Sequence, residues 1–106
     1  MTVTVDEDET LATIRRIHVD TGRLIDPHTA VGVAAASRAP SQTEVVTLAT
    51  AHPAKFPDAV EKATGQRPQL PDRMMWIATA PERYETLPNS ADALKRYIAR
   101  GQTAAG

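Results

Sequence analysis

Residues 45–56 read VVTLATAHPAKF, a β-branched apolar run that ends in a polar turn. A continuous apolar run of this length is typical of a strand buried on both faces of a parallel sheet. A helical pattern follows the turn, so the stretch predicts half of a parallel βα unit. Ligands of such sheets bind beyond the carboxyl ends of the strands. Thr50, Ala51 and His52 occupy that end, and we expect functional residues there.

The composition is that of one globular domain, with 106 residues of which 42% are hydrophobic. The net charge of −1 gives no electrostatic basis for binding nucleic acid or an anionic membrane. The absence of cysteine excludes disulfides, thiolate catalysis and zinc–thiolate sites. No apolar run approaches the ~20 residues that span a bilayer, and residues 1–10 lack the basic and apolar regions of a signal peptide. We therefore expect a cytoplasmic protein.

Helix and strand patterns surround the central stretch. We predict a strand over residues 45–51, helices over residues 6–21, 27–39, 56–64 and 91–100, helical turns over residues 71–77, and a short strand over residues 83–87. Leu94, Tyr97 and Ile98 are expected on the buried face of the last helix. Residues 1–100 then form the domain, and residues 101–106 form a flexible tail.

The predicted central strand has too few partners within the chain. A buried parallel strand needs neighbours on both sides and helices on both faces. The chain supplies the helices but only one other weak strand. The expected fold class is therefore α/β, with one central buried strand flanked by helices and an incomplete sheet. We expect the chain to be part of a larger domain.

Two motifs resemble signatures of one enzyme family. Residues 50–56, TAHPAKF, resemble a sequence near the C-terminus of threonine synthases, and residues 26–32, DPHTAVG, resemble a second signature one helix upstream. The resemblance covers most of residues 5–100, which corresponds to about the last quarter of such an enzyme. It implies a partial domain of a pyridoxal-phosphate enzyme with the tryptophan-synthase-β-like fold.

The resemblance implies that the chain is the C-terminal segment of a threonine synthase. Such an enzyme converts O-phosphohomoserine and water into threonine and phosphate, using pyridoxal 5′-phosphate. The missing N-terminal part is the implied partner and would supply the cofactor lysine and the phosphate cradle, because the glycines of this chain are scattered and the lysine motif is absent. The alternatives are a non-catalytic remnant or small interaction module, and a serine or threonine dehydratase of the same fold. The pairing of the two motifs favours threonine synthase.

Thr50 is the candidate cofactor-binding residue. In enzymes that this chain resembles, a Ser or Thr hydroxyl often faces the pyridine nitrogen of the cofactor, and Thr50 matches the threonine of the motif. A hydroxyl can donate a hydrogen bond to a neutral ring nitrogen, whereas a carboxylate would keep that nitrogen protonated. The alternative is that Thr50 only caps the turn after the strand. The motif favours the cofactor contact.

His28, His52 and Lys55 are the candidate substrate-binding residues. His52 either contacts cofactor or substrate or hydrogen-bonds the backbone of its turn, and a lone histidine is more often structural. Lys55 does not match the family's Ser-Phe-Lys motif, so it is not expected to bind the cofactor covalently. It is either a ligand of the substrate phosphate or a solvated lysine. We expect no catalytic residue in this chain.

Asp26 and His28 lie at the start of a predicted helix. Free N–H groups at such a start attract anions. An aspartate followed by proline at the first helical position is typical of an N-cap, which favours a structural role for Asp26. The role of His28 stays open. A metal site built from His18, His28, His52 and Asp26 is not expected, because the spacings match no ligand motif.

Overall fold

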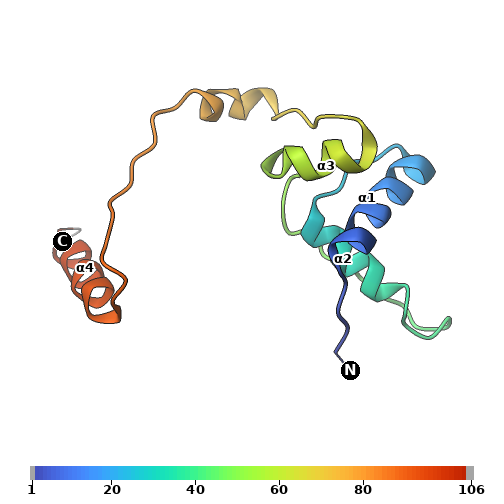
Figure 1. Cartoon of the computed structure of the whole chain (residues 1–106), viewed down its shortest axis with the longest axis horizontal. Coiled ribbons are helices and arrows are strands. Elements are labelled where there is room, and N and C mark those ends of the chain that lie inside the picture. The colour runs from blue at the N-terminus through green and yellow to red at the C-terminus, as the bar shows by residue number, and fades with distance from the viewer. Residues whose placement is uncertain (1, 105–106) are drawn as a thin grey trace. The chain divides into compact units, whose positions relative to one another are not determined.

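Glu7–Thr21 form the first helix, α1, of a computed structural model that describes residues 2–104, except the side chains of residues 102–104. The later elements are α2 (Pro27–Ala36), the 3₁₀ helix η1 (Pro53–Lys55), α3 (Pro57–Thr64), the 3₁₀ helix η2 (Asp72–Ala78) and α4 (Ala91–Ala104) (Figure 1). The chain divides into two units, residues 1–75 and residues 76–106. No helix among the described residues is long and apolar enough to cross a bilayer.

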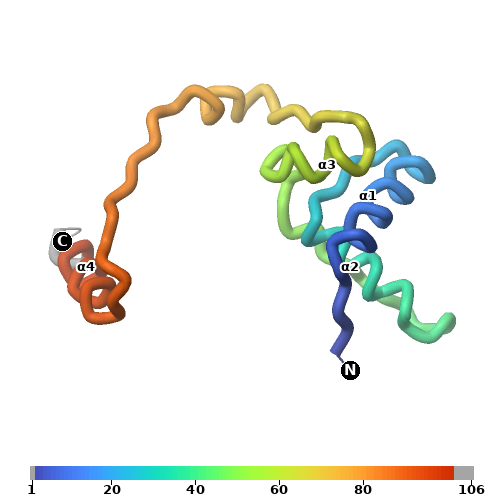
Figure 2. Tube along the Cα trace, in the orientation of Figure 1, coloured from blue at the N-terminus to red at the C-terminus, as the bar shows by residue number. Residues whose placement is uncertain are grey.

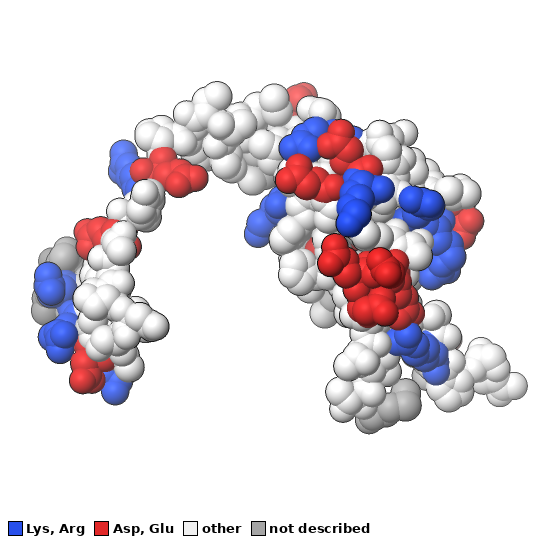
Figure 3. Space-filling model, in the orientation of Figure 1, with Lys and Arg blue, Asp and Glu red and all other residues white. Residues whose placement is uncertain are grey.

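Helix α1 begins and ends where the sequence predicts. The Asp6 carboxylate accepts a hydrogen bond of 2.8 Å from the Glu9 backbone N–H. The acidic residues of the first turn are stabilised by the positive end of the helix dipole. Gly22 follows the helix with a φ of 72°, a left-handed conformation that suits glycine. In Figure 3, acidic atoms gather over the start of α1 with basic atoms beside them. The predicted helix over residues 6–21 is confirmed.

The core of the first unit lies where α1 packs against α2 and α3 (Figure 2). Ile14, Ala30 and Ala63 form its buried cluster, and Leu11 and Ile25 pack against it. Small side chains on α2 and α3 allow the helices to approach α1 closely. Ala30 of α2 and Ala63 of α3 lie in this cluster, so both helices pack against α1.

Polar contacts join α1 to the rest of the first unit. The Arg15 guanidinium donates from Nε to the Ala63 carbonyl of α3 at 2.9 Å. Arg38, which follows α2, binds both carboxylate oxygens of Glu9 at 2.7 Å. Both contacts are made by Nη2 of Arg38, and its Nη1 donates to the Thr4 carbonyl at 3.1 Å. These contacts add to the apolar packing of α1 against α2 and α3.

The predicted central strand is absent from the described part of the chain. Residues 45–50 have no regular secondary structure, and the side chains of Val46 and Leu48 are 86% and 73% exposed. A strand is stabilised by hydrogen bonds to a neighbouring strand, and no described segment pairs with this one. The prediction of a buried strand is therefore wrong for this chain, and its described fold is helical rather than α/β.

The second unit also differs from the predictions. The short strand expected over residues 83–87 is not formed. Leu94, Tyr97 and Ile98 on α4 are exposed rather than buried. The helix includes Ala104 and so runs beyond the expected end at Arg100, while residues 105–106 lie outside the described residues. The helical turns expected over residues 71–77 are confirmed by η2. Within the described residues this unit contains no buried side chain.

We expect Ile14→Ala to lower the free energy of unfolding by about 2–5 kcal/mol, because it leaves a cavity in the core of the first unit. Ile98→Ala is the matched control, since Ile98 is 52% exposed on α4, and its effect should stay within about 0.5 kcal/mol. Urea unfolding followed by far-ultraviolet circular dichroism measures both values. Equal losses from the two substitutions would contradict the location of the core.

Candidate functional site

Helix α2 begins at a buried carboxylate. The Asp26 side chain is fully buried, and its oxygens accept hydrogen bonds from the backbone N–H groups of His28 at 3.0 Å and Thr29 at 3.3 Å. The Thr29 hydroxyl also donates to it. The next amide, that of Ala30, donates to the Asp26 carbonyl at 3.0 Å. Asp26 is thus an N-cap, and it leaves none of these amides free for an anion.

These hydrogen bonds determine the charge of Asp26. Burial raises the pKa of a carboxyl group, but the hydrogen bonds from Thr29 and His28 outweigh burial, and the pKa of Asp26 lies below its ordinary value of 3.8. At neutral pH the carboxylate is ionised and accepts hydrogen bonds only. His28 Nδ1 lies 3.0 Å from Oδ2 of Asp26, so Nδ1 must carry the hydrogen. The other ring nitrogen, Nε2, makes no hydrogen bond within the described region.

The two motifs meet at the ring of His28. The centroids of the His28 and Phe56 rings are 4.9 Å apart, and the ring planes are tilted by 59°. Phe56 ends η1, and its backbone N–H donates to the Pro53 carbonyl at 3.0 Å. The start of α2 and the end of the turn are therefore in direct contact. Local periodicity gives no sign of this pairing, although the presence of both family signatures hints at it.

A second contact joins α2 to the segment before the turn. A Cβ atom added at Gly32 would lie 2.8 Å from the Thr47 methyl carbon, so only glycine fits there without a shift. Gly32 lies between two valines within the helix, where glycine costs about 1 kcal/mol relative to alanine, so a packing reason for it is expected. Sequence reasoning did not single out Gly32 for this contact. It follows that α2 touches the segment at residue 47 and again at residue 56.

His52 supports the turn from within. Its Nδ1 accepts a hydrogen bond of 3.1 Å from the Ala54 backbone N–H, so His52 caps η1. This contact agrees with the structural interpretation of His52. The hydrogen bond leaves Nε2 as the only ring nitrogen of His52 that can act on a ligand.

Thr50 and Lys55 are exposed at this turn. Within the described region, no hydrogen bond is formed by the Thr50 hydroxyl or by the Lys55 ammonium. The turn is capped by His52 rather than by Thr50. The Thr50 hydroxyl is therefore available to a ligand. His28 is also exposed, and its ring contacts Phe56 at the end of the same turn.

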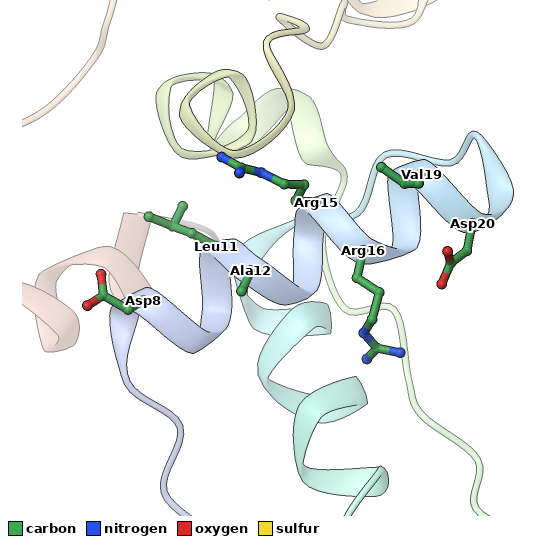
Figure 4. Close-up of a pocket in the computed structure, with 7 residues that line it drawn as sticks. All are labelled: Asp8, Leu11, Ala12, Arg15, Arg16, Val19 and Asp20. Atoms are coloured by element: carbon green, nitrogen blue, oxygen red, sulfur yellow. The ribbon is translucent and has the colours of Figure 1, made fainter.

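A hollow of about 510 Å³ lies along one side of α1 (Figure 4). Arg15 reaches toward α3 in this view and Arg16 points away from it. The residues that line the hollow all come from this one helix: Asp8, Leu11, Ala12, Arg15, Arg16, Val19 and Asp20. They do not converge on a common point, so the hollow has no arrangement for chemistry. No cluster of three or more potential metal ligands occurs among the described residues.

Comparison with known proteins shows similarity to one family. The family model "Threonine synthase, C-terminal" matches residues 29–98. Threonine synthase of Pseudomonas aeruginosa is 41% identical over 99 residues, which are 91% of this chain and 21% of that protein. The Corynebacterium glutamicum threonine synthase is 44% identical over 90 residues, 83% of this chain and 19% of that protein.

A solved structure shares the fold of this chain. The crystal structure of threonine synthase from Brucella melitensis with bound pyridoxal phosphate has a TM-score of 0.70 and 42% identity. The match covers 89% of this chain and 20% of the Brucella chain. This chain thus spans about a fifth of the length of the relatives that it matches.

We expect Asp26→Ala to lower the free energy of unfolding by about 2 kcal/mol or more, because it removes an N-cap and leaves buried donors unsatisfied. Asp6→Ala removes the exposed N-cap of α1 and is the matched control, with an expected loss of about 0.5–1 kcal/mol. Urea unfolding at neutral pH measures both losses. An equal loss at the two caps would contradict the importance of burial at Asp26.

The same carboxylate predicts how stability depends on pH. Because the pKa of Asp26 is lower in the folded chain than in the unfolded chain, its contribution is complete above the unfolded value. It is lost as the pH falls through the folded value. The difference in unfolding free energy between the parent and Asp26→Asn should therefore shrink on acidification below about pH 4. A difference that does not change with pH would rule out an ionised Asp26.

Proposed function

The chain belongs to the threonine synthase family, and on that premise we propose that it is the C-terminal segment of an enzyme that converts O-phosphohomoserine and water into threonine and phosphate. The contact between the two family signatures, made by His28 and Phe56, carries this proposal. The contact joins the two motifs that resemble family signatures, beside an accessible turn. The proposal includes the cytoplasmic location that the sequence predicts.

Pyridoxal phosphate, when bound in the complete enzyme, would supply the electron sink for the elimination and the addition of water. Thr50 is the proposed contact of this chain to its pyridine nitrogen. The Thr50 hydroxyl is exposed and has no partner in the described part of the chain, so it suits a ring nitrogen that needs a neutral donor. Such a donor holds the ring in place without adding a negative charge beside it.

The rest of the catalytic machinery must come from the missing N-terminal part. Lys55 is exposed at η1 and does not belong to the motif expected for the lysine that binds the cofactor. His52 and Lys55 flank Thr50 on the exposed turn and stay candidates for contact with the substrate phosphate, as does His28. We propose no acid or base among them.

We propose that residues 1–100 form part of an α/β domain whose other part covers the apolar segment at residues 45–48. Val45, Val46 and Leu48 are exposed in this chain. Three large apolar side chains within four residues are costly to leave in water. An unpaired segment of this kind can also complete a neighbouring sheet. The strand predicted from the sequence would then form only in the complete enzyme.

The role of Thr50 can be tested in a complete threonine synthase that carries this C-terminal segment. We expect Thr50→Val to weaken cofactor binding or turnover tenfold to hundredfold, which corresponds to about 1–3 kcal/mol for an unsatisfied buried ring nitrogen. Thr50→Ser should keep most of the function, and Thr50→Asp should change the visible absorbance of the bound cofactor. Thr43→Val is the matched control outside the turn and should have no effect.

Two results would contradict this assignment. Parent-like cofactor affinity and turnover in Thr50→Val would remove Thr50 from the cofactor site. Phosphate release from O-phosphohomoserine by this chain alone, abolished by Lys55→Ala, would show that the chain carries its own catalytic lysine.

Coverage of the apolar segment is tested by Val46→Lys. In this chain Val46 is 86% exposed, so we expect the unfolding free energy to change by less than about 0.5 kcal/mol. In the complete enzyme the same substitution would bury a charge, and we expect a clear fall in the melting temperature. Val46→Thr, which keeps the branched shape, is the control. Equal small effects in both proteins would show that the segment stays uncovered.

A further inference from the structure

Helix α2 holds the segment that carries Thr50 at two points. The first is the close approach of Gly32 to the Thr47 methyl group. The second is the contact between the His28 and Phe56 rings, with centroids 4.9 Å apart. Thr50 lies between these two points in the chain. Residues 43–50 have no regular secondary structure, so helix or sheet hydrogen bonds do not hold the segment in place.

The ring of His28 is itself held from the other side. Its Nδ1–H donates to the buried Asp26 carboxylate at 3.0 Å, while its backbone N–H donates to the same oxygen at 3.0 Å. The His28 side chain is 62% exposed, so burial in a core does not fix it. Its orientation depends on the carboxylate on one edge and on Phe56 at its face.

We propose that His28 is a positioning residue, through which Asp26 and Phe56 hold the turn at residues 50–55 in a fixed place on α2. The ring of His28 is bound to Asp26 at the start of α2 and packs against the ring of Phe56, so it links the two residues. Phe56 is joined to η1 through its hydrogen bond to the Pro53 carbonyl. His52, which directly follows Thr50 and Ala51, then accepts a hydrogen bond from the Ala54 backbone N–H of η1. In this way the exposed hydroxyl of Thr50 is presented from a defined position, although no hydrogen bond holds it.

His28→Ala tests the proposal with little disturbance elsewhere. The substitution removes the ring but keeps the backbone N–H that donates to Asp26, and alanine favours a helix more than histidine does. Helix α2 should therefore persist. NMR relaxation of the backbone amides of the full chain measures order residue by residue. We expect the order parameter of residues 50–52 to fall from about 0.85 in the parent to below about 0.6, with α1 and α3 unchanged.

Three further variants serve as a second test and as controls. Phe56→Leu removes the other ring and should lower the order parameters of residues 50–52 in the same way. Phe56→Tyr keeps the ring and should leave them at the parent value. His18→Ala makes the same chemical change as His28→Ala on α1 and should not affect residues 50–52. If His28→Ala unfolds the chain, the pair Phe56→Leu and Phe56→Tyr decides.

The proposal is overturned if residues 50–52 keep the parent order parameter in a folded His28→Ala or in Phe56→Leu. It is overturned as well if the parent value is already below about 0.6, or if His18→Ala lowers it equally. The use of this turn in cofactor binding rests on the proposed function, but the NMR measurement needs no cofactor. A complete enzyme with His28→Ala that binds pyridoxal phosphate like the parent, despite lowered order in the chain, would contradict the role of Thr50 and leave the positioning intact.

Discussion

The buried carboxylate of Asp26 is the interaction on which the rest of the first unit depends. It caps the start of α2, satisfies the first amides of that helix, and orients the ring of His28. A buried charge is costly unless hydrogen bonds compensate for it. Asp26 receives that compensation entirely from its own helix start. The arrangement is therefore local in sequence and needs no partner from another part of an enzyme.

Two parts of the first unit differ in whether they are stabilised by contacts within this chain. The core around Ile14, Ala30 and Ala63 is closed by three helices and is complete without a sheet. The segment at residues 45–48 is apolar but exposed, and it gains no backbone partner within the described residues. Side chains of this type require burial to contribute stability. The helical core is therefore independent of this segment, which we propose to be covered by another part of a complete enzyme.

The parts of the fold that the sequence predicts correctly are those that local rules govern. Asp6, Gly22 and the Asp26-Pro27 pair mark helix ends through their own hydrogen bonds and backbone angles, so α1 and the start of α2 could be predicted. Helix α2 ends at Ala36 rather than at the expected residue 39. The strand over residues 45–51 could not be predicted in this way, because a strand forms only with a partner that a single segment does not reveal. The predicted burial of the apolar face of α4 was wrong for a similar reason. An apolar face indicates that burial is favourable, but it does not show that another element packs against it.

The candidate site shows the same limit. Thr50 and His52 were found from the motif and from their place after the apolar run, and the capping role of His52 was an expected alternative. The His28–Phe56 contact and the Gly32–Thr47 contact were missed, because they join residues whose spacing follows no helical or strand period. Glycine within a helical run was the available signal for one of them. No property of His28 alone indicated its aromatic neighbour.

A turn that is already held in place has a consequence for assembly with the remainder of a threonine synthase. Ordering a residue on binding costs about 1–2 kcal/mol of backbone entropy, so a disordered turn would weaken both docking and ligand contact. The contacts of α2 at residues 47 and 56 supply part of this order beforehand. Residues 45 and 46 precede the first contact and remain free to adapt to a neighbouring strand. In the proposed complete enzyme, this arrangement would let residues 45 and 46 pair with a neighbouring strand while Thr50 stays in place.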